Sequence, residues 1–441
     1  MVKVGIVSLG CSKNQVDAEL MMALICQEGF QLCADPSQCD VVLVNTCGFI
    51  EDAKRESIET ILEFAAGKGK GPLKCLVVTG CLAERYREEL ATEIPEADVV
   101  LGIGKNQEIA AAIRRALAGD RVVEFAPKEA LSLEGERVLA NPPYFAYIKV
   151  AEGCDNRCSY CAIPLIRGGF RSRRMEHILE EVRRLAAQGV REMNLVAQDT
   201  SRYGLDLYGK YMLPELIREV CKVEGVRWVR VLYCYPDRIT DELIQTMAAE
   251  PKVCKYIDIP VQHGSGKVLK EMNRTGDRQS ILEVVRRIRE GIPGVVVRTT
   301  MIAGFPGETE EDFAELQALV AEGEFQRLGC FAYSQEEDTP AGERRDQLDE
   351  ELRRRRAGLI MEQQAPIAFA FAQSCVGKEL EVLVEGRRKD GRYYGRSYMD
   401  APDIDTRVYF TGKKDHRPGE FVQVTVTGAS DYDLLGEEAP R

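Results

Sequence analysis

The sequence lacks any long hydrophobic run and any excess of positive charge. No apolar stretch in its 441 residues approaches the ~18 residues of a membrane-spanning helix. Its 59 lysines and arginines are outnumbered by 71 aspartates and glutamates, which gives a formal net charge of −12. This balance disfavours broad binding to nucleic-acid phosphates. We therefore expect a cytosolic protein without a membrane partner.

A fourth cysteine is missing from a motif that holds three. The stretch AEGCDNRCSYCAIP contains Cys154, Cys158 and Cys161 at the spacing C-x3-C-x2-C. A four-iron cluster or a structural zinc takes four thiolates, and no second C-x2-C pair follows that would complete a zinc ribbon. Disulfides are rare in the cytosol, so patterned cysteines indicate metal binding or catalysis. Three thiolates on a four-iron cluster leave one iron open, which is typical of a catalytic site.

Three further cysteines each end a short, β-branched apolar run near the N-terminus. The runs KVGIVSLGC, DVVLVNTC and CLVVTGC end at Cys11, Cys47 and Cys81. Helical patterns at 15–29 and 51–66 separate them, which predicts a parallel β-α-β-α-β arrangement. Carboxyl ends of parallel strands meet at one edge, where open α/β sheets bind ligands. We expect the three cysteines to converge there; the alternative is three unrelated buried thiols.

The central region repeats a strand followed by a helix. Six strand-like runs predict a partial barrel of parallel strands, whose active face lies at the carboxyl ends of the strands. The runs occupy 143–153, 191–199, 226–236, 255–263, 294–308 and 325–334. Polar side chains gather at their ends: Gln198, Asp199, Asp258, Gln262, His263 and Arg298. We expect Tyr233 and Tyr235 to pack within a strand. His263 either caps the next helix or enters the pocket.

The last part of the chain begins with a long charged helical pattern. It covers 346–373, is expected to break near Pro366, and contains an RRRR run that we interpret as a solvated helix face. From Val376 onward, short alternating strands with glycine turns predict a small antiparallel barrel. One of its loops carries Asp400, Asp403 and Asp405. This acidic loop is expected to be solvated or to bind a basic partner.

These patterns predict an α/β protein with three domains. The expected domains are an N-terminal parallel α/β (Rossmann-like) domain at 1–130, a partial (β/α)6 barrel at 140–370 and a small antiparallel β-barrel at 372–441.

The C-x3-C-x2-C loop after a first barrel strand resembles the radical S-adenosylmethionine (SAM) enzymes. The resemblance implies a [4Fe-4S] cluster on Cys154, Cys158 and Cys161, with SAM chelating the open iron and being cleaved to a 5′-deoxyadenosyl radical. A second cysteine set and a C-terminal TRAM barrel make the chain similar to the methylthiotransferases, with the signatures SLGCSKN, VNTCGF and TGCLAERY. In that family, Cys11, Cys47 and Cys81 would hold a second [4Fe-4S] cluster. The SAM pocket would be lined by Gln198, Arg298, Ile302, Gly304 and Phe305.

The methylthiotransferase family has branches that modify tRNA and branches that modify ribosomal protein. SLGCSKN, EGCDNRCSYCAIP and YYGRSYMDAPDID resemble the second branch. This implies that an aspartate of ribosomal protein S12 receives sulfur and a methyl group at its β-carbon. A low-potential electron donor such as flavodoxin or ferredoxin, and a sulfur donor, are also implied. The acidic C-terminal segment makes tRNA an unlikely partner.

Two alternatives remain open at this point. One is a tRNA adenosine methylthiotransferase, and the other is a non-catalytic iron–sulfur electron-transfer or RNA-binding protein. An electron-transfer protein would not need six β-α units and a TRAM barrel, whereas an RNA-binding protein would use the TRAM barrel.

Overall fold

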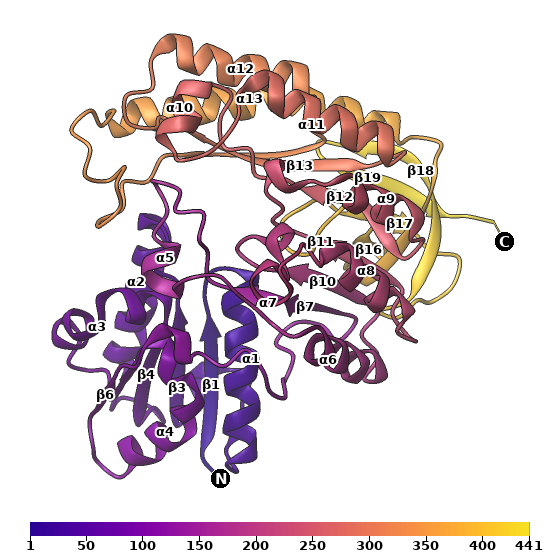
Figure 1. The fold of residues 1–441 in the computed structure, drawn as a ribbon. Coiled ribbons are helices and arrows are strands. Elements are labelled where there is room, and N and C mark those ends of the chain that lie inside the picture. Colours follow the sequence, from indigo (N-terminus) through magenta and orange to yellow (C-terminus); the bar gives the residue numbers. More distant parts are fainter. Residues whose placement is uncertain (441) are drawn as a thin grey trace.

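A six-stranded parallel sheet forms the N-terminal part of the computed structural model, which describes residues 1–440 (Figure 1). Its strand order is β2-β1-β3-β4-β5-β6. Strands β3 and β4 are buried along their whole length, as expected for strands covered on both faces. The predicted parallel α/β domain is therefore confirmed. The strands are β1 (Lys3–Ser8), β2 (Gln31–Leu32), β3 (Val41–Thr46), β4 (Cys75–Gly80), β5 (Val99–Leu101) and β6 (Val122–Glu124), and the helices are α1 (Ser12–Gln27), α2 (Glu51–Gly67), α3 (Cys81–Glu93) and α4 (Ile109–Leu117).

The central sheet is an open barrel of six parallel strands in the order β14-β13-β12-β11-β10-β7. Its outer face carries the helices that the sequence pattern predicts between the strands. The strands are β7 (Phe145–Lys149), β10 (Glu192–Val196), β11 (Trp228–Val231), β12 (Val253–Asp258), β13 (Val296–Ala303) and β14 (Arg327–Ala332). The helices are α6 (Met175–Ala187), α8 (Leu213–Lys222), α9 (Asp241–Ala249), α11 (Arg278–Gly291) and α12 (Glu310–Gly323), with shorter ones at α5 (Ile163–Arg167), α7 (Leu205–Tyr208) and α10 (Gly266–Glu271). Within residues 1–440, no helix is long and apolar enough to cross a membrane.

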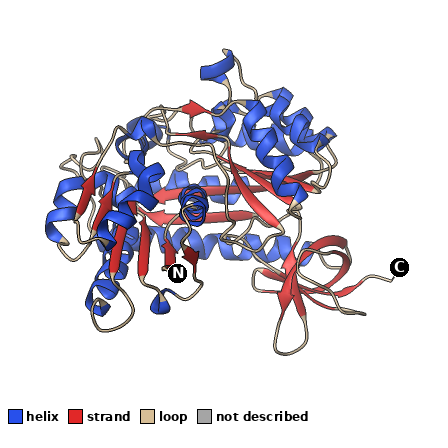
Figure 2. Ribbon diagram, turned by 90° about the horizontal axis from the view of Figure 1, so that it is seen from below, coloured by secondary structure: helices blue, strands red, loops and turns tan. Residues whose placement is uncertain are grey.

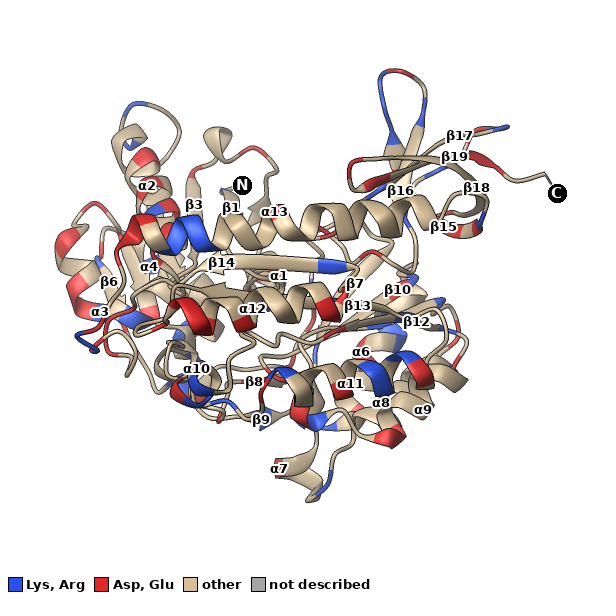
Figure 3. Ribbon diagram, turned by 90° about the horizontal axis from the view of Figure 1, so that it is seen from above, with Lys and Arg blue, Asp and Glu red and all other residues tan. Residues whose placement is uncertain are grey.

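The long helix α13 (Glu350–Ser374) runs through Pro366 without the predicted break. Proline removes one backbone hydrogen bond, but Ile360 before it and Ile367 after it pack against the barrel core and hold the helix in place. The solvated-face interpretation of its arginines is also wrong in part. Arg356 is buried in an ion pair with Glu308, whereas Arg354 and Arg355 are exposed. Figure 3 shows this basic stretch in blue near the start of α13.

A closed five-stranded barrel, β15-β16-β17-β19-β18, ends the chain and stands apart from the other two sheets in Figure 2. Its strands are β15 (Glu379–Arg387), β16 (Tyr393–Arg396), β17 (Val408–Thr411), β18 (Phe421–Ser430) and β19 (Asp433–Glu438). The barrel shares one hydrophobic core with Phe145, Trp228 and Val296, which lie at the amino ends of central strands. The C-terminal barrel therefore covers the amino-terminal end of the central sheet.

The acidic loop of the C-terminal barrel contacts the central sheet through its three carboxylates. Asp400 is buried and accepts a hydrogen bond from Arg327 Nη2 at 2.7 Å. Asp405 accepts one from the Tyr256 hydroxyl at 2.6 Å, and Asp403 accepts one from the Tyr147 hydroxyl at 3.2 Å. The expected solvation is wrong for Asp400, which is buried, whereas Asp403 is exposed. All three carboxylates help to hold the two barrels together, and binding of a basic partner stays a prediction. The domain limits 1–130, 140–370 and 372–441 stay a prediction.

Candidate active site

The C-x3-C-x2-C loop follows β7 and is fixed by backbone hydrogen bonds. The Cys154 amide donates to the Gly168 carbonyl at 3.1 Å, and the Cys161 amide donates to the Cys158 carbonyl at 3.0 Å. Burial raises the pKa of the Cys154 thiol to about 11, and neighbouring Cys158 adds to the rise. The pKa of Cys161 is raised by burial and then by Cys158 and Cys154. The three thiols thus lie close enough to influence one another.

Two polar side chains approach the Cys158 sulfur from the side of the solvent. The Tyr235 hydroxyl lies 2.8 Å from Cys158 Sγ, and Arg274 Nη1 lies 3.9 Å from it. The Arg274 guanidinium also sits over the Tyr235 ring, 4.2 Å from its centroid. A hollow of about 270 Å³ reaches both side chains. Tyr235 lies beyond the end of β11, so its predicted role as a strand packing residue is wrong, and its hydroxyl instead contacts a predicted cluster ligand.

The second cysteine group lies at the carboxyl edge of the N-terminal sheet, as predicted. Cys11 precedes α1, Cys47 directly follows β3, and Cys81 begins α3 after β4. Gly10 has a φ of +88°, and a Cβ at this position would lie 2.9 Å from Cys47 Sγ, so glycine lets the two loops approach. Burial raises the pKa of Cys47 to about 12, and Cys81 and Cys11 add to the rise. The topology therefore brings these thiols into one group.

The two cysteine groups meet at the contact between the N-terminal and central sheets. Cys81 packs in one small apolar cluster with Ala162 and Ile166. Ala162 directly follows Cys161 in the chain, so the segment that carries one cysteine group contacts a member of the other group. Chemistry that uses both groups on one substrate needs this closeness.

A buried network of charges joins the two groups. Arg167 Nη2 lies 3.0 Å from Cys81 Sγ, and Arg167 Nη1 lies 3.2 Å from Glu152. Arg167 and Lys149 both pair with Asp17 of α1 and with Glu152, which precedes Cys154 by two residues. Burial alone raises the pKa of Glu152, but Lys149 and Arg167 outweigh burial and hold that pKa well below its ordinary value. Two cations thus balance two carboxylates across the domain contact.

Gln198, a predicted SAM-pocket residue, lies at the edge of this network. Its Nε2 donates to Glu152 Oε1 at 2.6 Å. Its Oε1 is buried and has no hydrogen-bond partner within residues 1–440. A buried acceptor without a partner fits a bound ligand that donates a hydrogen bond.

The other predicted pocket residues are engaged with protein groups. Arg298 Nη1 lies 3.0 Å from Asp258 Oδ1, and Arg298 Nε lies 3.7 Å from Asp405 Oδ1. The amides of Gly304 and Phe305 both donate to Glu308 Oε2, at 2.8 and 3.2 Å. Ile302 is partly buried on β13. Their contacts with SAM stay a prediction.

Gly304 has a second reason to be glycine. Its φ is +78°, and a Cβ there would lie within 2.5–2.8 Å of Arg353 on α13. The glycine-containing loop at this strand end therefore makes room for α13, a role that the sequence pattern did not suggest.

The helix after His263 is capped by Ser265, whose side chain accepts a hydrogen bond from the Val268 amide, so the predicted capping role of His263 is wrong. His263 instead holds the Ser265 backbone, and its role in the pocket stays a prediction. Its Nδ1 accepts the Ser265 amide at 2.9 Å, immediately before α10. Its Nε2 lies 3.2 Å from Glu308 Oε2, and the ring is buried. Both ring nitrogens have protein partners.

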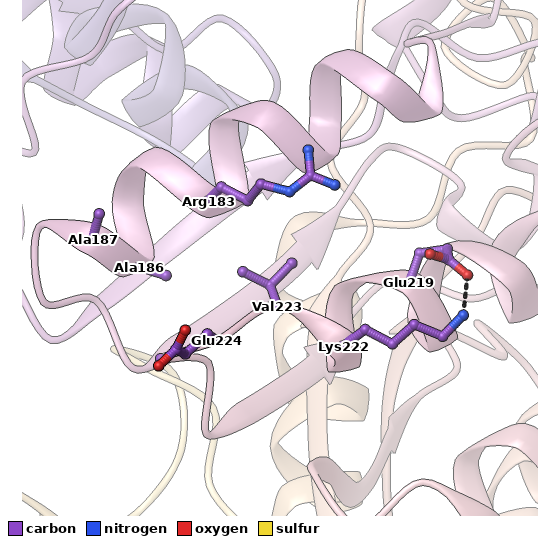
Figure 4. A pocket seen from close by; sticks show the side chains of 8 residues that line it. Arg183, Ala186, Ala187, Glu219, Lys222, Val223 and Glu224 are labelled. Atoms are coloured by element: carbon purple, nitrogen blue, oxygen red, sulfur yellow. Dashed lines mark hydrogen bonds and ion pairs between the residues drawn. The ribbon is translucent and has the colours of Figure 1, made fainter.

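A larger hollow lies away from this chemistry. It has a volume of about 530 Å³ and lies between α6 and α8 on the outer side of the central sheet (Figure 4). Its lining includes Arg183, Glu219 and Lys222, and the last two are paired with each other. It contains no cysteine or histidine, so the candidate site remains at the two cysteine groups.

The two cysteine groups suit a cluster of several irons and not a single metal ion. Within residues 1–440, no three Cys, His, Asp or Glu side chains are close enough to share a single metal ion. A four-iron cluster has a different requirement, because each thiolate binds a separate iron. Each group offers three thiols with an arginine beside one sulfur, Arg167 or Arg274. The residues therefore fit iron–sulfur clusters better than a mononuclear ion.

Known proteins resemble the chain over its whole length. Family models match residues 3–102 (Uncharacterized protein family UPF0004), 148–320 (Radical SAM superfamily) and 376–438 (TRAM domain). The ribosomal protein uS12 methylthiotransferase RimO of Thermoanaerobacter sp. (strain X514) is 49% identical over 438 residues, covering 99% of this chain and 100% of that protein. The protein of the same name from Caldanaerobacter subterraneus subsp. tengcongensis is 50% identical, with the same coverage.

Solved structures support the fold. The radical S-adenosylmethionine methyltransferase TsrM from Kitasatospora setae, with tryptophan and a SAM analogue bound, has a TM-score of 0.50 at 16% identity and covers 78% of this chain and 75% of that chain. The cobalamin-dependent S-adenosylmethionine radical enzyme OxsB has a TM-score of 0.53 at 13% identity, with coverages of 78% and 55%. The full-length identity near one half, the three matching domain models and the two facing cysteine groups lead to one conclusion. This chain belongs to the family of ribosomal protein uS12 methylthiotransferases within the radical SAM superfamily.

Proposed function

We propose that the protein inserts sulfur and a methyl group at the β-carbon of an aspartate of ribosomal protein S12. The acceptor follows from the names of relatives that are about 50% identical over the full chain. The observation that carries the chemistry is the contact of Cys81 with Ala162, which brings two cysteine groups together. An electron carrier has no need for a second open cluster at such a contact.

Two [4Fe-4S] clusters are part of this proposal. Cys154, Cys158 and Cys161 would hold the cluster that binds SAM, and Cys11, Cys47 and Cys81 would hold the one that offers sulfur. Together with bound SAM, the first cluster supplies a radical that removes hydrogen from an unactivated carbon.

Protein side chains have separate tasks at this site. With Cys158 as a thiolate ligand of the cluster, the Tyr235 hydroxyl and Arg274 Nη1 would both donate toward its sulfur and stabilise the negative charge there. The Oε1 of Gln198, which has no hydrogen-bond partner within residues 1–440, is suited to accept a hydrogen bond from SAM. The C-terminal barrel covers the amino-terminal end of the central sheet, which leaves the opposite end, where the cysteine loops lie, for SAM and the acceptor.

Further partners are proposed with the same activity. SAM would contact Gln198, Arg298, Ile302, Gly304 and Phe305. A low-potential carrier such as flavodoxin or ferredoxin would donate electrons. A separate sulfur donor would resupply the sulfur that each turnover consumes. Because ribosomal protein is the acceptor, the enzyme would work in the cytoplasm.

An anaerobic reaction tests the proposal. The iron-reconstituted protein is incubated with reductant, sulfide, SAM and isolated S12, and S12 is digested for mass spectrometry. We expect the mass of one methylthio group on an aspartate, together with 5′-deoxyadenosine. If tRNA added to the same mixture were modified while S12 stayed unchanged, the protein would instead be assigned to the tRNA-modifying branch.

A further inference from the structure

Lys13 is a buried cation without a carboxylate partner. Three lysines are buried, namely Lys13, Lys54 and Lys149. Lys54 pairs with Glu51 and Glu336, and Lys149 pairs with Asp17 and Glu152. Lys13 is 8% exposed, yet no carboxylate oxygen within residues 1–440 lies within 4.0 Å of its Nζ. Buried lysines are almost always paired, so this ammonium is expected to meet an anion.

The Lys13 ammonium is held in place by an aromatic ring. Its Nζ lies over the Tyr233 ring, 3.4 Å from the centroid. Tyr233 has a φ of +62°, which is rare for a bulky residue and costs about 1–3 kcal/mol. Asp258 accepts the Tyr233 amide at 3.0 Å, and Arg298 fixes Asp258 from the other side. The central sheet therefore maintains a strained backbone that places the ring beneath the lysine.

The start of helix α1 offers additional anion-binding groups at this position. Ser12 Oγ is buried and has no hydrogen-bond partner within residues 1–440. No side chain caps the helix at Cys11, and its first turn contains no acidic residue. The positive end of the helix dipole, the unpartnered Ser12 hydroxyl and the Lys13 ammonium thus belong to the same first turn of α1. Cys11, the exposed thiol of its group, is two residues away from the lysine.

We propose that Lys13 binds the side-chain carboxylate of the acceptor aspartate. The inference rests on the proposed function and deepens it. The β-carbon of aspartate is bonded directly to its carboxylate carbon. A carboxylate held on Lys13 therefore presents this carbon beside the cysteine group that would offer the sulfur. A neutral nucleobase would gain nothing comparable from a buried ammonium, so Lys13 selects a protein acceptor.

Lys13 also lies two residues from Cys11, so a second role for its charge is to neutralise a cluster bound to Cys11. The two roles, binding of the acceptor carboxylate and neutralisation of the cluster, predict different dependence on the acceptor. Selection of a carboxylate depends on the acceptor, whereas neutralisation affects the cluster whether or not the acceptor is present.

A double-mutant cycle separates binding of the acceptor carboxylate from neutralisation of the cluster. Binding of fluorescently labelled S12, with either the native acceptor aspartate or asparagine in its place, is measured by anisotropy with iron-loaded enzyme. The wild-type enzyme is expected to prefer aspartate by about 10- to 100-fold, the range for a charged hydrogen bond. Lys13→Met and Lys13→Gln should lower this ratio to within about twofold of unity. Lys13→Arg keeps the charge and should retain most of the preference.

Lys54→Met is the matched control, because it removes another buried lysine and should leave the aspartate preference unchanged. Iron content and the reduction potential are measured for every variant. An unchanged aspartate preference in Lys13→Met and Lys13→Gln overturns the proposal, and a shifted potential in those variants would then assign the lysine to the cluster. If the wild-type enzyme neither binds nor modifies S12, it is the proposed function that fails.

Discussion

Replacing Arg167 by methionine tests the charge network between the two cysteine groups. The substitution keeps much of the apolar stem and removes the guanidinium. Arg167 and Lys149 face Asp17 and Glu152, and all four side chains are at most 2% exposed. The variant would leave one cation for two buried carboxylates. Removal of one partner from a buried ion pair costs about 3–5 kcal/mol.

This loss should depend on pH in a defined direction. In the wild-type protein, Glu152 has a depressed pKa, so its ion pairs contribute stability at neutral pH that is lost only as the pH falls through that low value. In the variant, burial is opposed by one cation fewer, so the pKa of Glu152 rises. Protonation then relieves the unpaired charge. The difference in stability between the two proteins should shrink between pH 7 and pH 5.

Urea unfolding of the iron-free, reduced proteins measures this difference at both pH values. Arg286→Met is the control, because Arg286 pairs only with exposed Glu283 and Glu290 on α11, and no measurable change in midpoint is expected. A variant at Arg167 that is as stable as wild type at pH 7 would refute the reasoning. A large loss that stays constant between pH 7 and pH 5 would refute the assignment to Glu152.

Three further outcomes are expected. Alanine at all three cysteines of either group should remove about half of the iron. SAM cleavage should vanish only when Cys154, Cys158 and Cys161 are replaced. If the folded variant of Cys11, Cys47 and Cys81 also lost SAM cleavage, the separate roles of the two cysteine groups would be contradicted. Tyr235→Phe removes a hydrogen bond to Cys158 Sγ and should lower the reduction potential of the iron-loaded protein in an EPR-monitored titration; an unchanged potential would show that the bond is absent in the loaded enzyme. Glu192→Gln weakens buried pairs with Arg396 and Arg230 by about 3 kcal/mol. It should red-shift the fluorescence of Trp228, the single tryptophan, which packs on Phe421 of the C-terminal barrel; an unshifted spectrum with normal stability would contradict this role for Glu192.

The elements and the cysteine groups were predictable because both leave local signals. Period-two and period-3.6 patterns mark strands and helices. Cys11, Cys47 and Cys81 each directly follow such a strand or its short exit loop, so topology alone places them at one edge.

Other features depend on partners far away in the chain, and no local signal marks them. Asp400 looks like a solvated loop residue until Arg327 is placed beside it by the packing of two barrels. Arg167 lies in a loop-helix segment after the first cluster motif, and its partner Asp17 is 150 residues away. Gly304 is explained by Arg353 on α13, the third element after the strand that Gly304 follows. These are tertiary effects that override what a short window can indicate.

The C-terminal barrel at the amino-terminal end of the central sheet has a consequence for the order in which SAM and the acceptor bind. With that end filled by the C-terminal barrel, SAM and the acceptor both have to use the opposite end, where the cysteine loops lie. A bound protein acceptor would then lie over the entry route of the small molecule. Two SAM molecules are consumed for each methylthio group in the proposed reaction, so spent SAM has to leave and fresh SAM has to enter between the two steps. The steady-state kinetics should accordingly show SAM binding before S12, and S12 in excess should slow the exchange of spent SAM products.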